Sequence, residues 1–157
     1  RAAYRSYREG RSRLPSRRNV LRFSKTDLYA IDSEYVVDKL EILSGVHDPV
    51  LANRGGAKGR AEARVFLRHE FEQHGFRVTE HRYRTGVNLV AERKGKSGKF
   101  LIVSAHYDSV NNPGADDDGS GTVALLATAK LLSDKVLEHG VRFVAFDEEE
   151  LGLVGSA

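Results

Sequence analysis

Residues 99–156 read KFLIVSAHYDSVNNPGADDDGSGTVALLATAKLLSDKVLEHGVRFVAFDEEELGLVGS, and this stretch decides the fold of the 157-residue chain. Two apolar runs within it, residues 100–105 and 141–146, have the length and the β-branched and aromatic content of strands. Between them, residues 122–132 place apolar side chains at helical spacings. A strand, a helix and a second strand in this order predict two parallel strands joined by a right-handed crossover.

Polar side chains gather where these predicted elements end or begin. The first strand ends in the letters HYD (106–108), the second ends in DEEE (147–150), and DDD (116–118) precedes the helix. The carboxyl ends of two parallel strands lie at the same edge of a sheet, and the crossover helix begins there. The three groups should therefore converge on one rim, where open α/β sheets bind ligands.

The residue types on this rim indicate a metal site. Carboxylates brought together repel one another unless a cation neutralises them, and a mixed His and carboxylate set suits zinc, manganese or cobalt better than calcium. Asp108 lies two residues after His106 on extended chain, so it is placed to accept a hydrogen bond from the far ring nitrogen of that imidazole. A Glu beside a metal is suited to take a proton from the attacking water.

Each motif also has a purely structural interpretation. The acid triplet could cap a helix, because the helix dipole favours acids at its N-terminus. The run 148–150 could be an acidic first turn of a helix, and His106 alone could be a hydrogen-bonded structural histidine. The coincidence of all three on one predicted rim favours the metal site.

Three blocks, AHYDS, PGADDDGSG and FDEEELGLVGS, resemble in this order and spacing the co-catalytic di-zinc aminopeptidase family. This is family twenty-eight of the metallopeptidases, which includes aminopeptidase Y, bacterial leucyl aminopeptidases and glutamate carboxypeptidase II. The resemblance covers residues from about 53 to the last, most strongly from residue 100 onward. It implies an α/β fold of the zinc exopeptidase type, a three-layer sandwich with a mixed, mostly parallel central sheet flanked by helices.

The resemblance also implies a role for each matched residue. His106 is similar to the His ligand of one zinc, Asp117 to the aspartate that bridges both metals, and Glu150 to the carboxylate ligand of the other zinc. Glu149 is similar to the general base, and Asp108 to the carboxylate that orients the His ligand. The resemblance further implies a cis peptide bond between Asp117 and the residue that follows it.

The family pattern needs two more ligands downstream, an Asp for the His106 metal and a His for the Glu150 metal. Catalytic zinc normally has three protein ligands, so each metal is one ligand short in the residues present. We therefore expect the chain to be the N-terminal part of a longer enzyme, truncated at its C-terminus. Residues 26–157 would form the first part of a single catalytic domain, and residues 1–25 a disordered basic arm.

The function implied by the resemblance is that of a zinc-dependent aminopeptidase, with two Zn²⁺ ions and peptides with a free N-terminus as substrates. Two alternatives stay open: a glutaminyl cyclase-like acyltransferase with a single zinc, and a non-catalytic receptor-like relative of the same fold. The resemblance favours a secreted or periplasmic protein.

Composition limits the remaining function classes. Residues 1–25 hold nine Lys and Arg against one acidic residue, whereas the rest of the chain holds 16 basic and 21 acidic residues. An Arg-rich arm with interleaved Tyr suits nucleic acid or an anionic membrane, but a short charge run is more commonly solvated, and we expect no nucleic-acid partner. The absence of Cys excludes disulfides and thiolate zinc sites, and no apolar segment is long enough for a membrane span.

The first part of the sequence predicts two helices and three strands. The helices span residues 32–43, with Ser33 as the N-cap, and 60–74; the strands span residues 76–83, 87–92 and 99–105. A hairpin turn at residues 94–98 is expected to join the last two strands. The apolar face of the second helix is expected to consist of Ala61, Ala63, Val65, Phe66, Leu67 and Phe71.

The glycine-rich segment 54–59 could suggest a phosphate-binding loop. It lacks the Gly-Lys-Ser/Thr ending and the preceding strand of such a loop, so the phosphate-binding interpretation is rejected.

Overall fold

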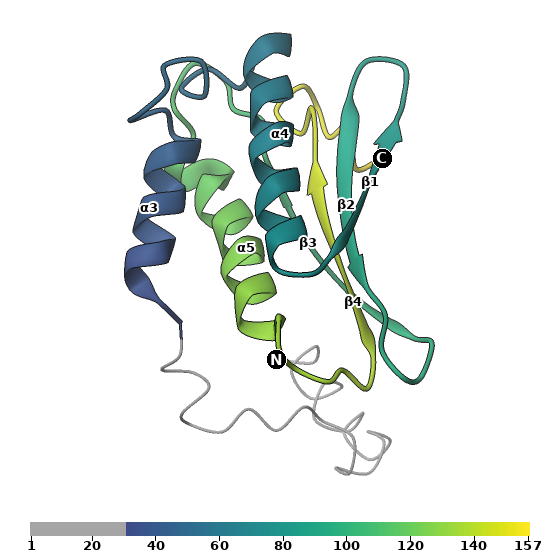
Figure 1. The fold of residues 1–157 in the computed structure, drawn as a ribbon. Coiled ribbons are helices and arrows are strands. Elements are labelled where there is room, and N and C mark those ends of the chain that lie inside the picture. The colour runs from purple at the N-terminus through teal and green to yellow at the C-terminus, as the bar shows by residue number, and fades with distance from the viewer. Residues whose placement is uncertain (1–30) are drawn as a thin grey trace, which may run out of the picture.

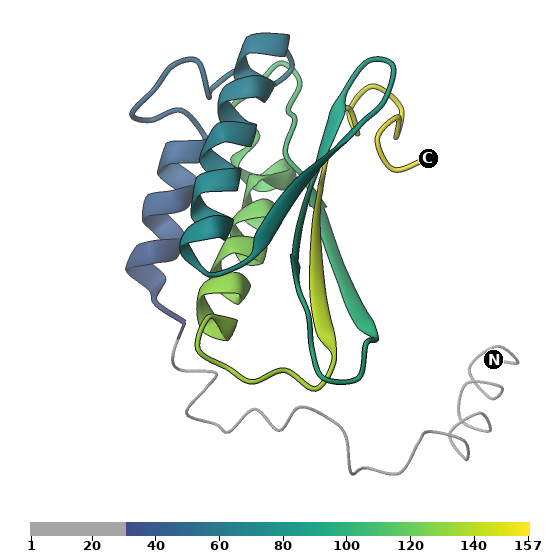
Figure 2. The same ribbon diagram turned by 45° about the vertical axis from the view of Figure 1, so that its right-hand side comes forward.

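The structure, a computed structural model, describes residues 31–157, so the predicted basic arm lies outside the described residues. A four-stranded sheet lies on one side of the molecule and the helices on the other (Figures 1 and 2). In chain order the elements are α3 (Ser33–Leu43), α4 (Ala57–Gln73), β1 (Arg77–Arg82), β2 (Val87–Arg93), β3 (Phe100–His106), the irregular turn η3 (Ala115–Gly119), α5 (Ser120–Leu132) and β4 (Gly140–Phe146).

The sheet is mixed and has the strand order β1-β2-β4-β3. Strands β3 and β4 are parallel, with Phe100 opposite Gly140 and His106 opposite Phe146, and α5 connects them along the face of the sheet. The predicted strand–helix–strand unit is therefore confirmed. Strand β2 pairs antiparallel with both β1 and β4, so two of the three strand pairings among the described residues are antiparallel rather than parallel.

The predicted hairpin between β2 and β3 is wrong, because β4 lies between these two strands. Most side chains of β4 are buried, which suits a strand with a neighbour on each side. The segment after β2 instead packs against the chain that enters β4: the amides of Lys96 and Ser97 donate to the carbonyls of Leu137 and Glu138. Turn residues between two strands indicate a reversal of the chain, but they do not show whether a later strand will insert between the two.

The α/β class and the helices flanking a mixed sheet are confirmed, but the described helices cover one face of the sheet. Helix α4 contacts β1 and β2, α5 contacts β3, and α3 packs against α5 (Figure 2). Residues 31–157 thus provide two layers of the expected three-layer sandwich. On β3, which is one of the two edge strands of the described sheet, Leu101 is 56% exposed and Ile102 is 60% exposed.

Both predicted N-terminal helices form, with shifted details. The N-cap of α3 is Asp32 rather than Ser33, because the Asp32 carboxylate accepts a hydrogen bond from the Tyr35 amide at 3.1 Å. Helix α4 begins at Ala57, three residues earlier than predicted. Val65 was expected on its apolar face but is 65% exposed. Within residues 31–157, no helix has the length and apolarity that crossing a membrane requires.

The hydrophobic core lies between the helices and the sheet. Phe143 of β4 is fully buried, and its ring stacks on Phe71 of α4 with centroids 5.6 Å apart. The ring of Phe76 lies against Phe143 at 5.2 Å. Because β4 is the strand that ends in the acidic run, this aromatic cluster holds in place the strand that leads into the candidate site.

We expect Phe143→Ala to lower the free energy of unfolding by about 3–5 kcal/mol, because it removes the ring on which two others pack and leaves a cavity. Val65→Ala on the exposed side of α4 is the matched control and should change it by less than about 0.5 kcal/mol. Urea unfolding followed by circular dichroism measures both. Equal effects of the two substitutions would contradict this description of the core.

Candidate metal centre and active site

The loops that follow β3 and β4 and the start of α5 meet at one edge of the sheet, as predicted. The Tyr107 amide donates to the Phe146 carbonyl at 3.0 Å, so the two chains leave the sheet side by side. The Asp118 carboxylate accepts hydrogen bonds from the amide of His106 and the amide of Gly121, each at 3.1 Å. This side chain ties the end of β3 to the first turn of α5. Sequence reasoning gave Asp118 no role of its own.

The structure brings four of the five predicted site residues together: Asp108, Asp117 and Glu149 all lie beside His106. The Nε2 atom of His106 lies 3.0 Å from Oδ1 of Asp117 and 3.7 Å from Oε2 of Glu149. The Asp117–Asp118 peptide bond is cis, as the resemblance implies. One imidazole nitrogen therefore faces two carboxylates that come from different loops.

The other ring nitrogen of His106 faces inward. Nδ1 is buried 3.3 Å from Oδ1 of Asp108, but among the described residues no acceptor is aligned for a hydrogen bond with it. Burial opposes a charge on this imidazole, but the carboxylates of Asp108 and Asp117 outweigh burial and raise the pKa of His106 to about 9. The carboxylates of Asp117 and Glu149 beside Nε2 favour positive charge at this position, and a divalent cation bound to the neutral ring would supply it.

Asp108 has a second role that the sequence did not indicate. One of its oxygens accepts a hydrogen bond from the Glu149 amide at 3.1 Å, and the other accepts from the Glu150 amide at 3.2 Å. Burial favours the neutral acid, but the His106 side chain and these two amides hold the pKa of Asp108 below its usual range. Asp108 therefore joins the loop after β3 to the loop after β4.

The acidic run after β4 divides into two halves, which sequence reasoning treated as one group. Asp147 and Glu148 are buried and face α4, where Arg60 contacts both of them. Glu149 and Glu150 remain partly exposed at the rim. The sequence does contain a signal for a basic partner of these buried acids: Arg60 and Arg64 lie four residues apart and so share one face of the helix.

Arg54 holds the loop between β3 and α5 in place. It is fully buried, and its guanidinium donates to the carbonyls of five residues: Leu43, Leu51, Tyr107, Pro113 and Gly114. Burial lowers the pKa of Arg54 to about 10. Arg54 opens the glycine-rich segment that was rejected as a phosphate loop, and its side chain points into the protein.

The ligand set expected for zinc is present in part. His106 and Asp117 lie together, whereas the Glu150 side chain makes no hydrogen bond or ion pair within residues 31–157, although its amide is bound to Asp108. In that same part of the chain, no three His, Asp or Glu side chains, His106, Asp117 and Glu149 included, are placed so that they could hold one metal ion between them. The donor types suit zinc, and the arrangement supplies an incomplete set of ligands.

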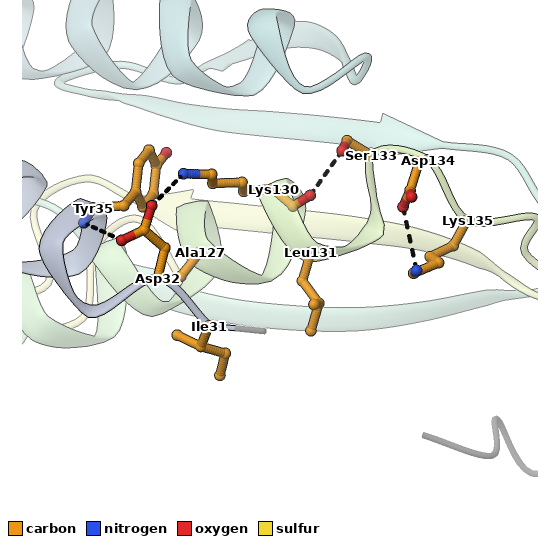
Figure 3. A pocket seen from close by; sticks show the side chains of 9 residues that line it. All are labelled: Ile31, Asp32, Tyr35, Ala127, Lys130, Leu131, Ser133, Asp134 and Lys135. Carbon is orange, nitrogen blue, oxygen red and sulfur yellow. Dashed lines mark hydrogen bonds and ion pairs between the residues drawn. The ribbon is translucent and has the colours of Figure 1, made fainter. Parts of the chain in front are cut away.

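A separate pocket lies at the other end of α5, away from this rim. It opens between the start of α3 and the end of α5 (Figure 3). Its volume is about 290 Å³. An ion pair between Lys130 and Asp32, 3.0 Å long, crosses it beside the Tyr35 ring. None of the predicted site residues lines this pocket.

Comparison with known proteins gives matches that centre on this part of the chain. Residues 88–157 match the sequence model of Peptidase family M28. Aminopeptidase YwaD of Bacillus subtilis is 44% identical over 77 residues, which are 46% of this chain and 17% of that protein. This chain therefore spans a small part of the length of that relative.

Two solved structures share the fold at low identity. The LapA protein of Legionella pneumophila superposes with a TM-score of 0.73 and 22% identity, covering 89% of this chain and 43% of that one. A glutaminyl cyclase from Fimbriiglobus ruber gives a TM-score of 0.65 and 21% identity, covering 85% of this chain and 49% of that one. At these identities the likeness shows a common fold.

We expect Arg54→Met to lower the free energy of unfolding by at least about 3 kcal/mol, because it leaves several buried carbonyls without a donor. Arg82→Met removes an exposed arginine that pairs with Glu80, and should change it by less than about 1 kcal/mol. Urea titration of both variants checks the difference. A small effect of Arg54→Met would show that the loop does not depend on this side chain.

Proposed function

Through residues 88–157 this chain belongs to peptidase family M28, and we propose that the complete protein is a zinc-dependent aminopeptidase. It removes the N-terminal residue from peptides with a free N-terminus. The observation that carries the proposal is the approach of Asp117 and Glu149 to one imidazole nitrogen of His106, at 3.0 and 3.7 Å, on a rim between two parallel strands.

His106 and Asp117 would hold one zinc ion, and Asp117 and Glu150 a second. Each site needs one more protein ligand, and we propose that an Asp and a His outside the described residues provide them. Zinc supplies Lewis acidity toward the scissile carbonyl and the attacking water. The buried Asp108 keeps the His106 ring oriented from its other nitrogen.

Glu149 is the proposed general base. Its carboxylate is partly exposed and faces Nε2 of His106, so it borders the space where substrate and water would meet. It takes a proton from the attacking water and returns it to the leaving amine. The hydrogen bond from its amide to Asp108 holds the base in position relative to the His ligand.

The alternatives from the sequence have weaker support. Glutaminyl cyclases share the fold at 21% identity, whereas the curated relatives at 38–44% identity are aminopeptidases. A non-catalytic relative would have no need of the metal and base residues, yet His106, Asp117, Glu149 and Glu150 are all present.

We expect Glu149→Gln in the complete protein to lower kcat by about 100- to 10,000-fold, because the amide cannot accept the proton, while zinc content stays unchanged. Glu62→Gln, an exposed acid on α4, is the matched control and should keep full activity. Release of aniline from aminoacyl anilides measures kcat, and cyclisation of N-terminal glutamine is assayed in parallel. Retained hydrolysis in Glu149→Gln would refute the base assignment, and cyclisation without hydrolysis would refute the aminopeptidase.

The expected metal content is two zinc ions per chain in the complete protein, measured by mass spectrometry of the metal. His106→Ala removes a nitrogen ligand and should lower the zinc content by about one ion per chain. His139→Ala, an exposed histidine beside Ser97, should leave it unchanged. One zinc per chain in the unaltered protein would instead support the single-zinc alternative.

A further inference from the structure

The turn that carries Glu149 and Glu150 begins with a residue in a backbone conformation unusual for its type. Glu148 has a φ of +55°, in the left-handed region that favours glycine. This conformation separates the inward-facing acids Asp147 and Glu148 from the rim-facing Glu149 and Glu150. Contacts outside the turn must hold a non-glycine residue there.

The inward-facing acids are enclosed by specific partners. One Asp147 oxygen lies 3.0 Å from Nε of Arg60, and the other accepts a hydrogen bond from the Val87 amide at 2.9 Å. One Glu148 oxygen lies 3.2 Å from Nη2 of Arg60, and the other accepts from the Thr85 hydroxyl at 2.6 Å. A single guanidinium thus bridges the carboxylates of two adjacent residues, which are 1% and 3% exposed.

Arg64 contributes less to this pair. Its Nη1 atom lies 3.5 Å from Asp147 and also donates a hydrogen bond to the Tyr107 hydroxyl at 3.0 Å. Arg64 therefore contacts Asp147 alone of the two acids, through an atom that also binds Tyr107. The Arg60 side chain is itself held in place, because its Nη1 atom donates a hydrogen bond to the Gly55 carbonyl at 2.6 Å. Within residues 31–157, loss of Arg60 would leave the buried Glu148 without a cationic partner and Asp147 with a weak one, which is costly for a buried charge.

The turn is therefore held from two sides. Asp108 binds the amides of Glu149 and Glu150 from the β3 side, and Arg60 binds the side chains of Asp147 and Glu148 from α4. We propose that Arg60 is a positioning residue, which acts through this acid pair to fix the Glu149 carboxylate beside His106. The inference rests on the proposed function, because it takes Glu149 to be the base of that reaction.

The first test compares three variants of the complete protein in steady-state hydrolysis. Arg60→Gln should lower kcat by about 10- to 100-fold with KM within about 3-fold, since a small displacement of a reacting group costs this much. Arg60→Lys, which keeps the charge, should recover part of the loss. Arg68→Gln is the matched control from the same helix, where Arg68 pairs with Glu72 and Glu80 away from the rim, and kcat should stay within about 2-fold.

The second test does not depend on catalysis. Arg60→Gln should speed hydrogen exchange of the amides of residues 147–152 by about 10-fold, because the turn opens more often. Combining Arg60→Gln with Glu148→Gln removes the unmatched buried charge and should restore slow exchange and part of kcat. Arg68→Gln should leave exchange at these amides unchanged.

Three results would overturn the proposal. One is unchanged exchange and unchanged kcat in folded Arg60→Gln protein, and another is an equal loss of kcat in Arg60→Gln and Arg68→Gln. The third is a double variant no better than Arg60→Gln alone. If the unaltered protein hydrolyses no peptide, the aminopeptidase function fails, whereas the exchange measurements still decide whether Arg60 holds the turn.

Discussion

The parallel pairing of β3 and β4 is the constraint on which the site depends. It makes both strands end at the same edge, so that His106 and the acidic run leave the sheet together. Helix α5 begins at that edge, and Asp118 fastens its first turn to the end of β3. A register shift by one residue would turn His106 to the other face and separate it from Asp117.

The acidic residues in and around the candidate site fall into two classes, according to whether a positively charged or hydrogen-bond-donating group of the protein neutralises them. Those that face the interior each have a built-in partner: Asp147 and Glu148 have Arg60, and Asp108 has the imidazole and two backbone amides. Those at the rim, Asp117 and Glu150, have no Lys or Arg partner within residues 31–157. Within residues 31–157, the acids of the site that lack a cationic partner are thus those at the rim, where an added cation would neutralise them, which agrees with the zinc function proposed above.

The sequence predicted the elements and the convergence of His106, Asp117 and Glu149 because both follow from local periodicity and strand direction. It missed β4 lying between β2 and β3, since the order of strands depends on packing between distant segments. It missed Arg54 and Arg60 for the same reason: their acceptors lie up to 60 and 88 positions away along the chain. Val65 was misplaced because a helix buries only one stripe, and its edges cannot be located without the neighbouring sheet.

The buried guanidinium of Arg54 has a consequence for acid tolerance. Its acceptors are backbone carbonyls, which stay unprotonated at any pH that a protein normally meets. Ion pairs with carboxylates, by contrast, are lost once the carboxylates take up protons. The segment from Tyr107 to Gly114 is therefore anchored by contacts that acidification leaves intact. A chain secured in this way can pass through an acidic environment with this stretch of backbone still in place.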